Sequence, residues 1–476
     1  MEAKLLAIKK NKAKTTSCLK SGQRVQMDGR IWVSRKAWIM RTSFLGALGA
    51  ITANNLVQGI ILGDPLVVYS TLMPLHALMV FAVGWLFFKN PARGRIGNDL
   101  VSVIIPIYNQ VALIEEVIGA IFRSTYKNLE VVAVNDGSKD GTKEVLDYLR
   151  TIHPQLNVIH KKNGGKRTAV ATGFYASKGR YLILIDSDSI IEENAIEEFM
   201  KTFNANPKVG GVVGNGKVWN GNKNMLTKCQ DAWYDYAFNI HKTTESFFGA
   251  VLCCSGCMAG YRREAIAEYI PYWASSSTQF SDDRFLTSYA IATPWAKKEF
   301  TAISERLKES MSKYDDSEDR GLTSHTLTEW ETAYVPTAIV YTEVPETFRR
   351  FLKQQIRWKK GYIRTNFFVS AFFWRKNPLM STIFYLEFMN SLTAPLIFFI
   401  VYLYMPFILN NPWLTLSYFL GNLLIGVTAA ADYRFRDCKA KFWIYKPIMV
   451  MITTNINLWL LFPALWTFRK NLWFTR

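Results

Sequence analysis

The stretch YLILIDSDSII, residues 181–191, is a short apolar run that contains an Asp-Ser-Asp triplet. A continuous apolar run of this kind is typical of a strand buried on both faces of a parallel sheet. Two earlier stretches have the same form, VSVIIPIY at 101–108 and LEVVAVND at 129–136. A segment with helical periodicity follows each of them. Because strands alternate with helices, the sequence predicts a doubly wound, mainly parallel α/β sheet within residues 98–342.

The carboxyl ends of these three predicted strands carry residues suited to a binding site. Pro106 and Tyr108 end the first strand, Asp136 ends the second, and residues 186–188 follow the third. In doubly wound sheets, ligands bind outside the carboxyl ends of the strands. We therefore expect these residues to converge on one site.

The chemistry of that site follows from its carboxylates. Asp186 and Asp188 flank a single residue after a buried strand, which suits a hard divalent cation such as Mg²⁺ or Mn²⁺. The alternative is an ordinary polar loop, because a D-x-D triplet alone is common. Asp136 at the end of another strand favours the metal. The segment GGKRTAV, residues 164–170, is a Gly-rich turn with two basic residues that suits a diphosphate, with a solvated turn as the alternative.

Long uncharged segments lie on both sides of the predicted sheet. A helix of roughly 20 apolar residues can cross a bilayer, and the first two segments form a hairpin because only Gly-Asp-Pro separates them. The sequence therefore predicts an integral membrane protein. The segments are residues 43–62 and 66–88 before the sheet, and residues 379–409, 413–431 and 443–466 after it.

The 476-residue chain carries 57 Lys and Arg against 38 Asp and Glu, a formal net charge of +19. A positive charge of this size could bind nucleic acid. The basic residues, however, flank the apolar segments, as the positive-inside rule requires of cytoplasmic loops. We therefore expect no nucleic-acid partner, and a multi-pass plasma-membrane protein with a cytoplasmic sheet domain. The basic clusters are residues 4–41, 89–95, 349–364 and 434–441.

Residues 343–366 have apolar side chains at roughly helical spacing, with Arg and Lys at the remaining positions. This pattern predicts an amphipathic helix on the cytoplasmic surface of the membrane. The helix contains QQIRW at 354–358, and its alternative role is that of a plain surface anchor. The segment IWVSRKAWIM, residues 31–40, is a second candidate for an interfacial helix.

Two similar acidic motifs follow the predicted sheet strands, SDDRFLTS at 281–288 and SEDRGLTS at 317–324. Each reads as the start of a helix, where an acidic residue is favoured. A catalytic carboxylate is often placed at such a position. The local pattern does not decide which copy is catalytic.

Five ordered motifs, VNDGS, GGKR, DSD, the acidic pair and QQIRW, resemble those of processive family 2 glycosyltransferases. The resemblance is to hyaluronan synthases, chitin synthases and nodulation chitooligosaccharide synthases. It implies an α/β GT-A domain inserted between transmembrane helices, with Mg²⁺ or Mn²⁺ as cofactor. It also implies inverting transfer from a UDP-sugar donor to a growing β-linked polysaccharide, which leaves through the membrane helices.

The resemblance leaves the sugar and the oligomeric state open. We expect UDP-N-acetylglucosamine as the donor, because the relatives that this chain resembles all use it, with UDP-glucuronic acid as a second donor if the product is a heteropolymer. The alternative is a non-processive transferase that adds one sugar to a polyprenyl-phosphate lipid. The QQIRW motif and the terminal LWFTR argue against that alternative.

The resemblance also implies roles for individual residues. The acceptor site would be lined by Cys253 and Gly256, with Trp219 near it, and Asp188 would hold the metal. Phe474 stands where the family has Gly. The nucleotide-sugar would be bound by Pro106, Tyr108, Asp136, Lys166, Arg167, Asp186, Ser187, Gln354, Gln355, Arg357, Trp358, Trp473, Thr475 and Arg476.

In the family, the catalytic pair begins a helix that is followed by a strand and then by the interfacial helix. The residues after Asp319 fit that order, whereas a basic helix-like segment follows Asp283. We therefore predict Asp319 as the general base with Glu318 beside it, and residues 284–316 as an insertion. Asp283 stays open as the alternative, because SDDR lies closer behind the YRR at 261–263.

These inferences divide the chain into five parts. They are a basic cytoplasmic N-terminal segment with an interfacial helix (1–42), a transmembrane hairpin (43–88), the GT-A domain (98–342), the interfacial helix with QQIRW (343–366), and transmembrane helices with a re-entrant or interfacial segment that ends in LWFTR (379–476).

Overall fold

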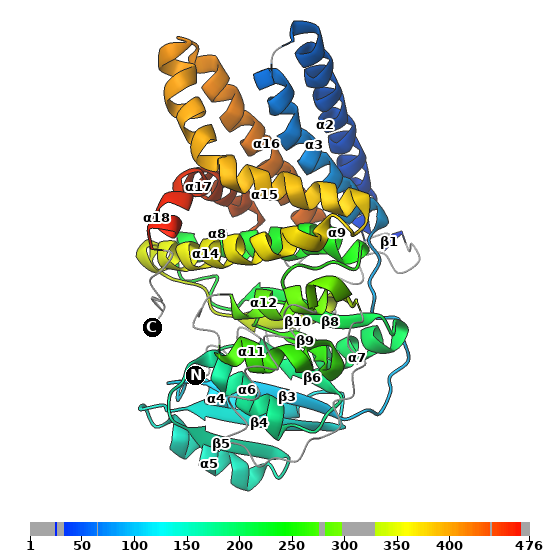
Figure 1. Ribbon diagram of the computed structural model, residues 1–476, viewed down its shortest axis with the longest axis vertical. Coiled ribbons are helices and arrows are strands. Elements are labelled where there is room, and N and C mark those ends of the chain that lie inside the picture. The colour runs from blue at the N-terminus through cyan, green and yellow to red at the C-terminus, as the bar shows by residue number, and fades with distance from the viewer. Residues whose placement is uncertain are drawn as a thin grey trace.

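The computed structural model describes residues 24–25, 33–63, 65–275, 281–297, 329–437 and 440–467. Within this part of the chain, a sheet domain lies below a group of upright helices. Helix α14 (Phe348–Phe373) runs across the molecule between the two (Figure 1).

A mixed, eight-stranded sheet is the centre of the domain, as the sequence predicts. Its strand order is β5-β4-β3-β6-β9-β8-β10-β7, and the pairs β5-β4, β4-β3, β3-β6 and β8-β10 are parallel. The strands are β3 (Val101–Ile107), β4 (Leu129–Asp136), β5 (Leu156–Lys161), β6 (Tyr181–Leu184), β7 (Ile190–Ile191), β8 (Val209–Val218), β9 (Ala259–Arg262) and β10 (Glu331–Thr342). A separate pair joins β1 (Arg24–Val25) to β2 (Val33–Ser34).

The three strands predicted from apolar runs, β3, β4 and β6, lie side by side in the sheet. All seven residues of β3 are buried. Helix α6 packs closely on β3, because a Cβ on Gly173 would lie 2.4 Å from the Ile104 side chain and only glycine avoids that clash. The helices that follow the sheet strands are α4 (Ile114–Phe122), α5 (Thr142–Ile152), α6 (Lys166–Ala176) and α7 (Ala195–Ala205).

Strand β10 is the strand that the sequence places before the interfacial helix. It enters the sheet between β8 and β7, parallel to β8. Its register shifts between Val335 and Ile339, where Pro336 has no N–H to donate to a neighbouring strand.

A nearly continuous helical segment connects β8 to the region of β9. It consists of α8 (Met225–Tyr236), the π-helix η2 (Ala237–His241) and α9 (Lys242–Phe247). Asn224 and Thr227 form a capping box at the start of α8. The Asn224 side chain accepts from the Thr227 N–H at 3.0 Å, and the Thr227 hydroxyl oxygen accepts from the Asn224 N–H at 3.0 Å. Shorter helices follow β9: α10 (Arg263–Ile266), η3 (Ala267–Tyr269), α11 (Ile270–Ser275) and α12 (Asp282–Ala290).

The upright group contains helices from both ends of the chain (Figure 1). Two helices in the described residues, Arg35–Ile61 and Pro378–Ile408, are long and apolar enough to cross a membrane, judged by length and composition; Thr71–Phe87 is apolar but shorter. The elements are α2 (Arg35–Leu62), α3 (Pro65–Ala82), η1 (Val83–Phe87), α15 (Pro378–Phe399), η5 (Ile400–Ile408), α16 (Pro412–Arg436), η6 (Trp443–Tyr445), α17 (Lys446–Trp459) and α18 (Leu461–Trp466).

Two of the expected segments have helix boundaries that differ from those of the sequence pattern. Within the described residues of the segment 31–40, Val33–Ser34 forms β2 and Arg35 begins α2, which continues into the apolar segment, so residues 35–40 are not a separate helix. The apolar run 443–466 is divided into α17 and α18, which meet at Leu460. Five predicted site residues lie outside the described part of the chain, namely Glu318, Asp319, Trp473, Thr475 and Arg476, and so do positions 298–316 of the predicted insertion.

Candidate active site

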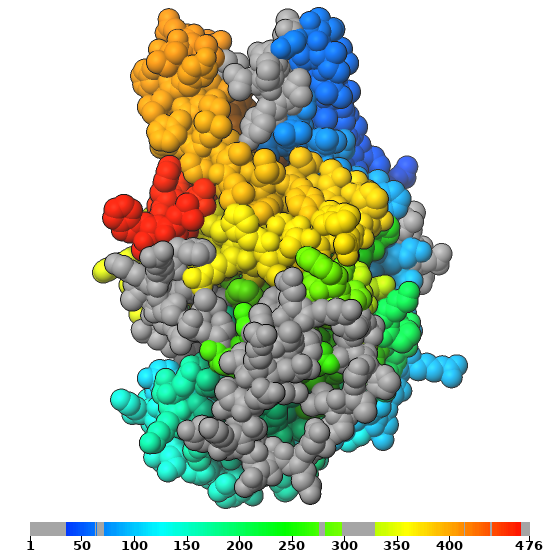
Figure 2. All heavy atoms as spheres, in the orientation of Figure 1, coloured from blue at the N-terminus to red at the C-terminus, as the bar shows by residue number. Residues whose placement is uncertain are grey.

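A cavity of about 2260 Å³ extends from the carboxyl ends of β3, β4 and β6 to the interior of the upright helices. Its lower part is lined by Pro106, Asp136 and Asp186 from the three strand ends. Its upper part is lined by residues of α2, α15 and α16. At the top of the molecule, the α2 side and the η5 side of the helix group stay apart (Figure 2). A single space therefore connects the sheet domain with the helices.

Asp136 organises the turn that enters α6. Its buried carboxylate accepts hydrogen bonds from the backbone N–H groups of Gly164 at 2.9 Å and Gly165 at 2.8 Å, and from Lys161 Nζ at 2.7 Å. Gly165 has a φ of +91°, a conformation that favours glycine. Asp136 therefore shapes the Gly-rich turn as well as lining the cavity.

Lys166 is the first residue of α6 and forms an ion pair with Asp186 at the end of β6. Burial alone would lower the pKa of Lys166, but the carboxylates of Asp186, Asp282 and Asp283 raise it above its usual value. Gly256 leaves room for this pair, because a Cβ there would lie 3.0 Å from Lys166 Nζ and 3.1 Å from Asp186 Oδ2. A positive charge is thus held beside three carboxylates that line the cavity.

Asp283, near the start of α12, belongs to the same cluster. Its Oδ2 accepts a hydrogen bond from the Gly256 N–H at 3.2 Å and lies 3.5 Å from Cys253 Sγ. Asp283, Cys253 and Gly256 all line the cavity. The first copy of the acidic motif is thereby placed beside the residues predicted to contact the acceptor.

Arg167, which the sequence assigns to the diphosphate, does not line the cavity. It is buried and paired with Asp282, and it also donates to the Trp273 carbonyl at 3.3 Å. Lys166 and Arg167 start a helix, so their side chains leave its axis about 100° apart. Only Lys166 is directed toward the cavity, and Arg167 fixes α12 and α11 against α6.

Helix α14 carries QQIRW along one side of the cavity. Trp358 stacks on Trp233 of α8, with ring centroids 6.0 Å apart and an interplanar angle of 21°. Helix α12 is tied to α14, because Arg284 donates to the Thr365 hydroxyl at 3.2 Å and to the Asn366 amide oxygen at 3.0 Å. The motif therefore lies opposite the strand ends and next to the acidic pair.

The structure brings most of the predicted site residues together. Trp219, like Arg167, is not among the cavity-lining residues. Those that line the cavity are Pro106, Tyr108, Asp136, Lys166, Asp186, Ser187, Asp188, Cys253, Gly256, Gln354, Gln355, Arg357 and Trp358.

Comparison with known proteins agrees with this arrangement. Residues 102–270 match the family described as glycosyl transferase family 2. This part of the chain is a family 2 glycosyltransferase domain. It contains six of the eight sheet strands complete and the turn around Asp136.

Relatives of the family 2 domain include polysaccharide-forming enzymes. The chain is 31% identical to a hyaluronan synthase of Streptococcus pyogenes over 298 residues, which is 60% of this chain and 62% of the relative. It is 30% identical to an N-acetylglucosaminyltransferase of Rhizobium meliloti over 274 residues, 56% of each. The chain thus spans somewhat less than two thirds of the length of these curated relatives.

Among solved structures, the fold is similar to that of a mannosyltransferase from Pyrobaculum calidifontis, solved in complex with GDP-Man and Mn²⁺. The TM-score is 0.50 at 19% identity, and the match covers 90% of this chain and 100% of the other. At that identity the similarity concerns the fold.

The family 2 domain offers carboxylate oxygens for a divalent cation. No group of three or more His, Cys, Asp or Glu side chains in the described residues is arranged to hold a metal by itself. Mg²⁺ and Mn²⁺ need no such cage, because they are commonly bound by one or two carboxylates together with substrate phosphates. Asp188 lines the cavity two residues after Asp186, which pairs with Lys166. The residues present therefore fit a cation that a diphosphate brings with it.

Several residues that line the cavity are not among the site residues predicted above. Trp233, Tyr234 and Tyr236 on α8 all line the cavity. A period of 3.6 does not distinguish an aromatic that faces a cavity from one that faces a core. Between the upright helices, polar and ionisable side chains line the cavity together with apolar ones. These polar and ionisable residues are Asn55, His76, Glu387, Asn390, Ser391, Tyr404, Ser417, Tyr418, Asn422, Thr453, Thr454 and Asn457.

Proposed function

We propose that this chain is a membrane-embedded, inverting and processive hexosyltransferase that polymerises a UDP-sugar into a β-linked polysaccharide and extrudes it. One observation carries the proposal: the cavity that holds Lys166, Asp186 and Asp283 continues between the helices, where amide, hydroxyl and ionisable groups line it together with apolar side chains. A transferase that releases a short soluble product has no need of such a continuation.

The acceptor side of the reaction rests on Asp283. Its carboxylate is held by the Gly256 N–H at 3.2 Å and faces the cavity, where an acceptor hydroxyl could donate to it. As general base it takes the hydroxyl proton while the oxygen attacks the anomeric carbon. The bond from that carbon to the diphosphate breaks, and UDP leaves with the bonding electrons. Inversion follows from attack on the face opposite the leaving group.

The donor side rests on positive charge. Lys166, at the N-terminus of α6, and Arg357, on α14, both line the cavity. Both stabilise negative charge that develops on the departing diphosphate. Mg²⁺ or Mn²⁺, held through Asp188 and the diphosphate, would supply further charge stabilisation. The remaining nucleotide-binding roles proposed for Trp473, Thr475 and Arg476 rest on sequence resemblance.

Sequence order favours Asp319 as the base, with Glu318 beside it, and spatial position supports Asp283. The support for Asp283 is its contact with Gly256 and its place next to the Lys166–Asp186 pair. We therefore assign the base to Asp283 and test Asp319 as the competing assignment. On this assignment the proposed insertion begins after the base.

A bilayer around the upright helices is part of the proposal. Large apolar side chains at the ends of these helices are more than two-thirds exposed, namely Ile60, Ile61, Phe407, Ile408 and Trp413. Exposed apolar surface of this kind indicates contact with lipid. The basic cluster on α14 then lies at the cytoplasmic face, in a multi-pass plasma-membrane protein with the family 2 domain in the cytoplasm. The five-part division of the chain follows from the same proposal.

The donor is proposed as UDP-N-acetylglucosamine, with UDP-glucuronic acid as a second donor if the polymer is of the hyaluronan type. The names of the hyaluronan synthase and N-acetylglucosaminyltransferase relatives support this choice. The second candidate function is transfer of a single sugar to a polyprenyl-phosphate lipid, since the cavity also reaches the region that lipid would occupy.

The test is incorporation of radiolabelled sugar by the purified full chain in detergent with Mn²⁺, from UDP-N-acetylglucosamine with and without UDP-glucuronic acid. High-molecular-weight product is expected, and a single lipid-linked sugar would favour the second candidate. Asp283→Asn should abolish incorporation while UDP binding, measured by calorimetry, persists. If Asp319→Asn alone abolishes it, the base is Asp319.

A further inference from the structure

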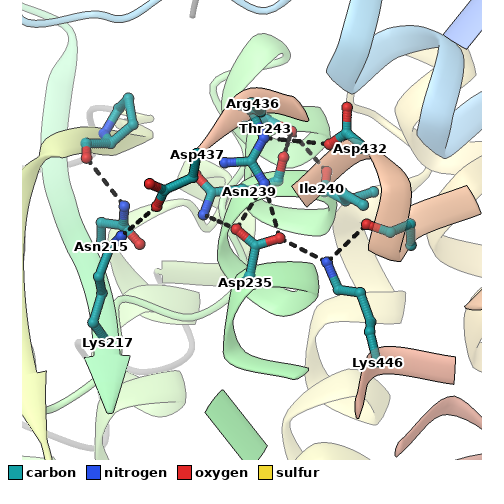
Figure 3. Close-up of polar contacts among 12 residues, drawn as sticks. Asn215, Lys217, Asp235, Asn239, Ile240, Thr243, Asp432, Arg436, Asp437 and Lys446 are labelled. Atoms are coloured by element: carbon teal, nitrogen blue, oxygen red, sulfur yellow. Dashed lines mark hydrogen bonds and ion pairs between the residues drawn. The ribbon is translucent and has the colours of Figure 1, made fainter. Parts of the chain in front are cut away.

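Asp235 of α8 lies at the centre of a group of polar contacts, here called the ionic hub (Figure 3). Its centre is Asp235, whose side chain is 5% exposed. Arg436 Nη2 donates to both carboxylate oxygens, at 2.6 and 2.8 Å, and Lys446 Nζ donates to Oδ2 at 2.6 Å. Arg436 ends α16 and Lys446 begins α17, so one carboxylate joins α8 to two of the upright helices.

The hub extends in both directions from Asp235. Toward the sheet, the Asn239 amide donates to Asp235 at 3.0 Å, and the Tyr334 hydroxyl of β10 donates to Asn239 at 2.9 Å. Toward the N-terminal helix, Arg436 also contacts Asp432 at 3.3 Å. Asp432 in turn accepts from Arg41 of α2 at 2.7 Å. A continuous line of polar contacts therefore runs from the sheet to α2.

The central carboxylate is ionised and held in place. Burial by itself would raise the pKa of Asp235, but Arg436 and Lys446 lower it below the usual range of an Asp. Breaking a buried pair of this kind leaves an uncompensated charge, which is costly. The position of α8 relative to α16 and α17 is therefore defined by several charge-assisted hydrogen bonds.

The opposite side of the same helical segment faces the cavity. From Trp233 to Glu245, the segment formed by α8, η2 and α9 supplies a row of cavity-lining residues. The row begins at Trp233, which stacks on Trp358, and ends at Glu245, next to the part of the cavity lined by Glu387. A π-helix interrupts it at η2, as is frequent at functional sites. Asp235 and Asn239 anchor the middle of this row.

We propose that Asp235 is a positioning residue that fixes the α8–η2–α9 segment as the wall along which the growing polysaccharide advances. The inference rests on the proposed polymerase function. A transfer step needs Asp283, Lys166 and the donor, none of which touches the hub. Advance of the product past Trp233 toward the helices needs the wall to keep its place. Loosening the hub should therefore shorten the product more than it slows single transfers.

The experiment uses the full chain in detergent with UDP-N-acetylglucosamine, with and without UDP-glucuronic acid, and Mn²⁺. Lys446→Met removes one donor to Asp235 and leaves Arg436 in place, so the helices keep a paired carboxylate. Lys217→Met is the matched control. It breaks the neighbouring ion pair of Lys217 with Asp437, at 3.0 Å, which ties β8 rather than α8 to the end of α16. Three quantities are compared: product length, initial rate of UDP release, and hydrogen exchange of residues 225–247.

For Lys446→Met, mean product length is expected to fall about threefold or more, within the range by which such coupling mutations act, while UDP release stays within about twofold. Exchange at residues 237–247 should become faster. Lys217→Met should leave product length and exchange unchanged. The inference is overturned if Lys446→Met keeps the wild-type product length, or if both variants shorten the product equally. If the wild type makes no product, the polymerase function fails, and unchanged exchange in Lys446→Met then overturns the positioning role by itself.

Discussion

The backbone N–H of Gly256 donates to the carboxylate of Asp283 at 3.2 Å, while the adjacent Asp282 pairs with buried Arg167. Two consecutive carboxylates at the start of one helix, both of which line the cavity, thus have different partners. Asp283 faces the cavity and remains accessible to an acceptor. Asp282 is part of the internal packing that holds α12 against α6.

Substitution of Gly256 by Ala should impair transfer without unfolding the domain. The new Cβ would press on Lys166 Nζ and Asp186 Oδ2, at 3.0 and 3.1 Å, and these groups must shift by a few tenths of an ångström. Because small misplacements at a reacting centre are costly, we expect kcat/KM to fall about tenfold. Initial-rate assays measure this. Gly119→Ala on α4, where a Cβ would meet only the Arg123 side chain, is the control and should keep wild-type rates.

Removal of the guanidinium in Arg167→Met should destabilise the domain rather than change its chemistry. Asp282 would be left buried without its cation, and breaking such pairs costs about 3–5 kcal/mol. The thermal midpoint should fall clearly, and the double variant Arg167→Met/Asp282→Asn should recover part of the loss. A normal midpoint with lost UDP binding would instead mean that Arg167 contacts the diphosphate, as the sequence suggested.

Glu245 should make stability depend on pH in the neutral range. Burial raises its pKa to about 7, with Lys242 and Arg284 lowering it and Glu387 raising it; the unfolded value is about 4.3. A raised folded pKa gives a contribution that is complete below the unfolded value and is lost as pH rises through about 7. Glu245→Gln should flatten the fall of the thermal midpoint between roughly pH 5 and 8. Exposed Glu115→Gln should leave the profile as in the wild type, and a profile unchanged by Glu245→Gln would contradict the prediction.

Chelation should separate nucleotide binding from fold stability. With EDTA, the thermal midpoint of the ligand-free chain should stay the same, while calorimetric binding of UDP should require added Mn²⁺ or Mg²⁺. Asp188→Asn should weaken metal-dependent UDP binding by at least the roughly 10- to 100-fold typical of changes near metal ligands. Tight UDP binding in EDTA would contradict a role for the cation.

Three strands, β3, β4 and β6, could be predicted from apolar runs in the sequence, at 101–107, 129–136 and 181–184. A strand buried on both faces needs β-branched and other apolar residues at nearly every position, so the run itself identifies it. The residues at the carboxyl ends of these strands lie close together because the three strands are parallel neighbours in the sheet. The amphipathic pattern likewise determined α14, which the structure extends to Phe373. Local patterns of this length contain all the information these elements need.

The choice between Lys166 and Arg167 was decided only by the tertiary structure. Both residues suit a diphosphate by type, but α6 starts at Lys166, and packing against α11 and α12 directs Arg167 inward. The same holds for the two acidic motifs, whose local sequences are nearly alike. The contact of Asp283 with Gly256 joins residues from separate elements, and no local pattern specifies it.

The sequence by itself thus determined the strands, the crossing helix and the set of residue types at the site. The tertiary structure decided that Lys166 rather than Arg167 lines the cavity, and it joined Asp235 to Arg436, about two hundred positions away. The physical reason is that burial and helical period are properties of a segment, whereas the direction of one charged side chain depends on partners that distant segments bring to it.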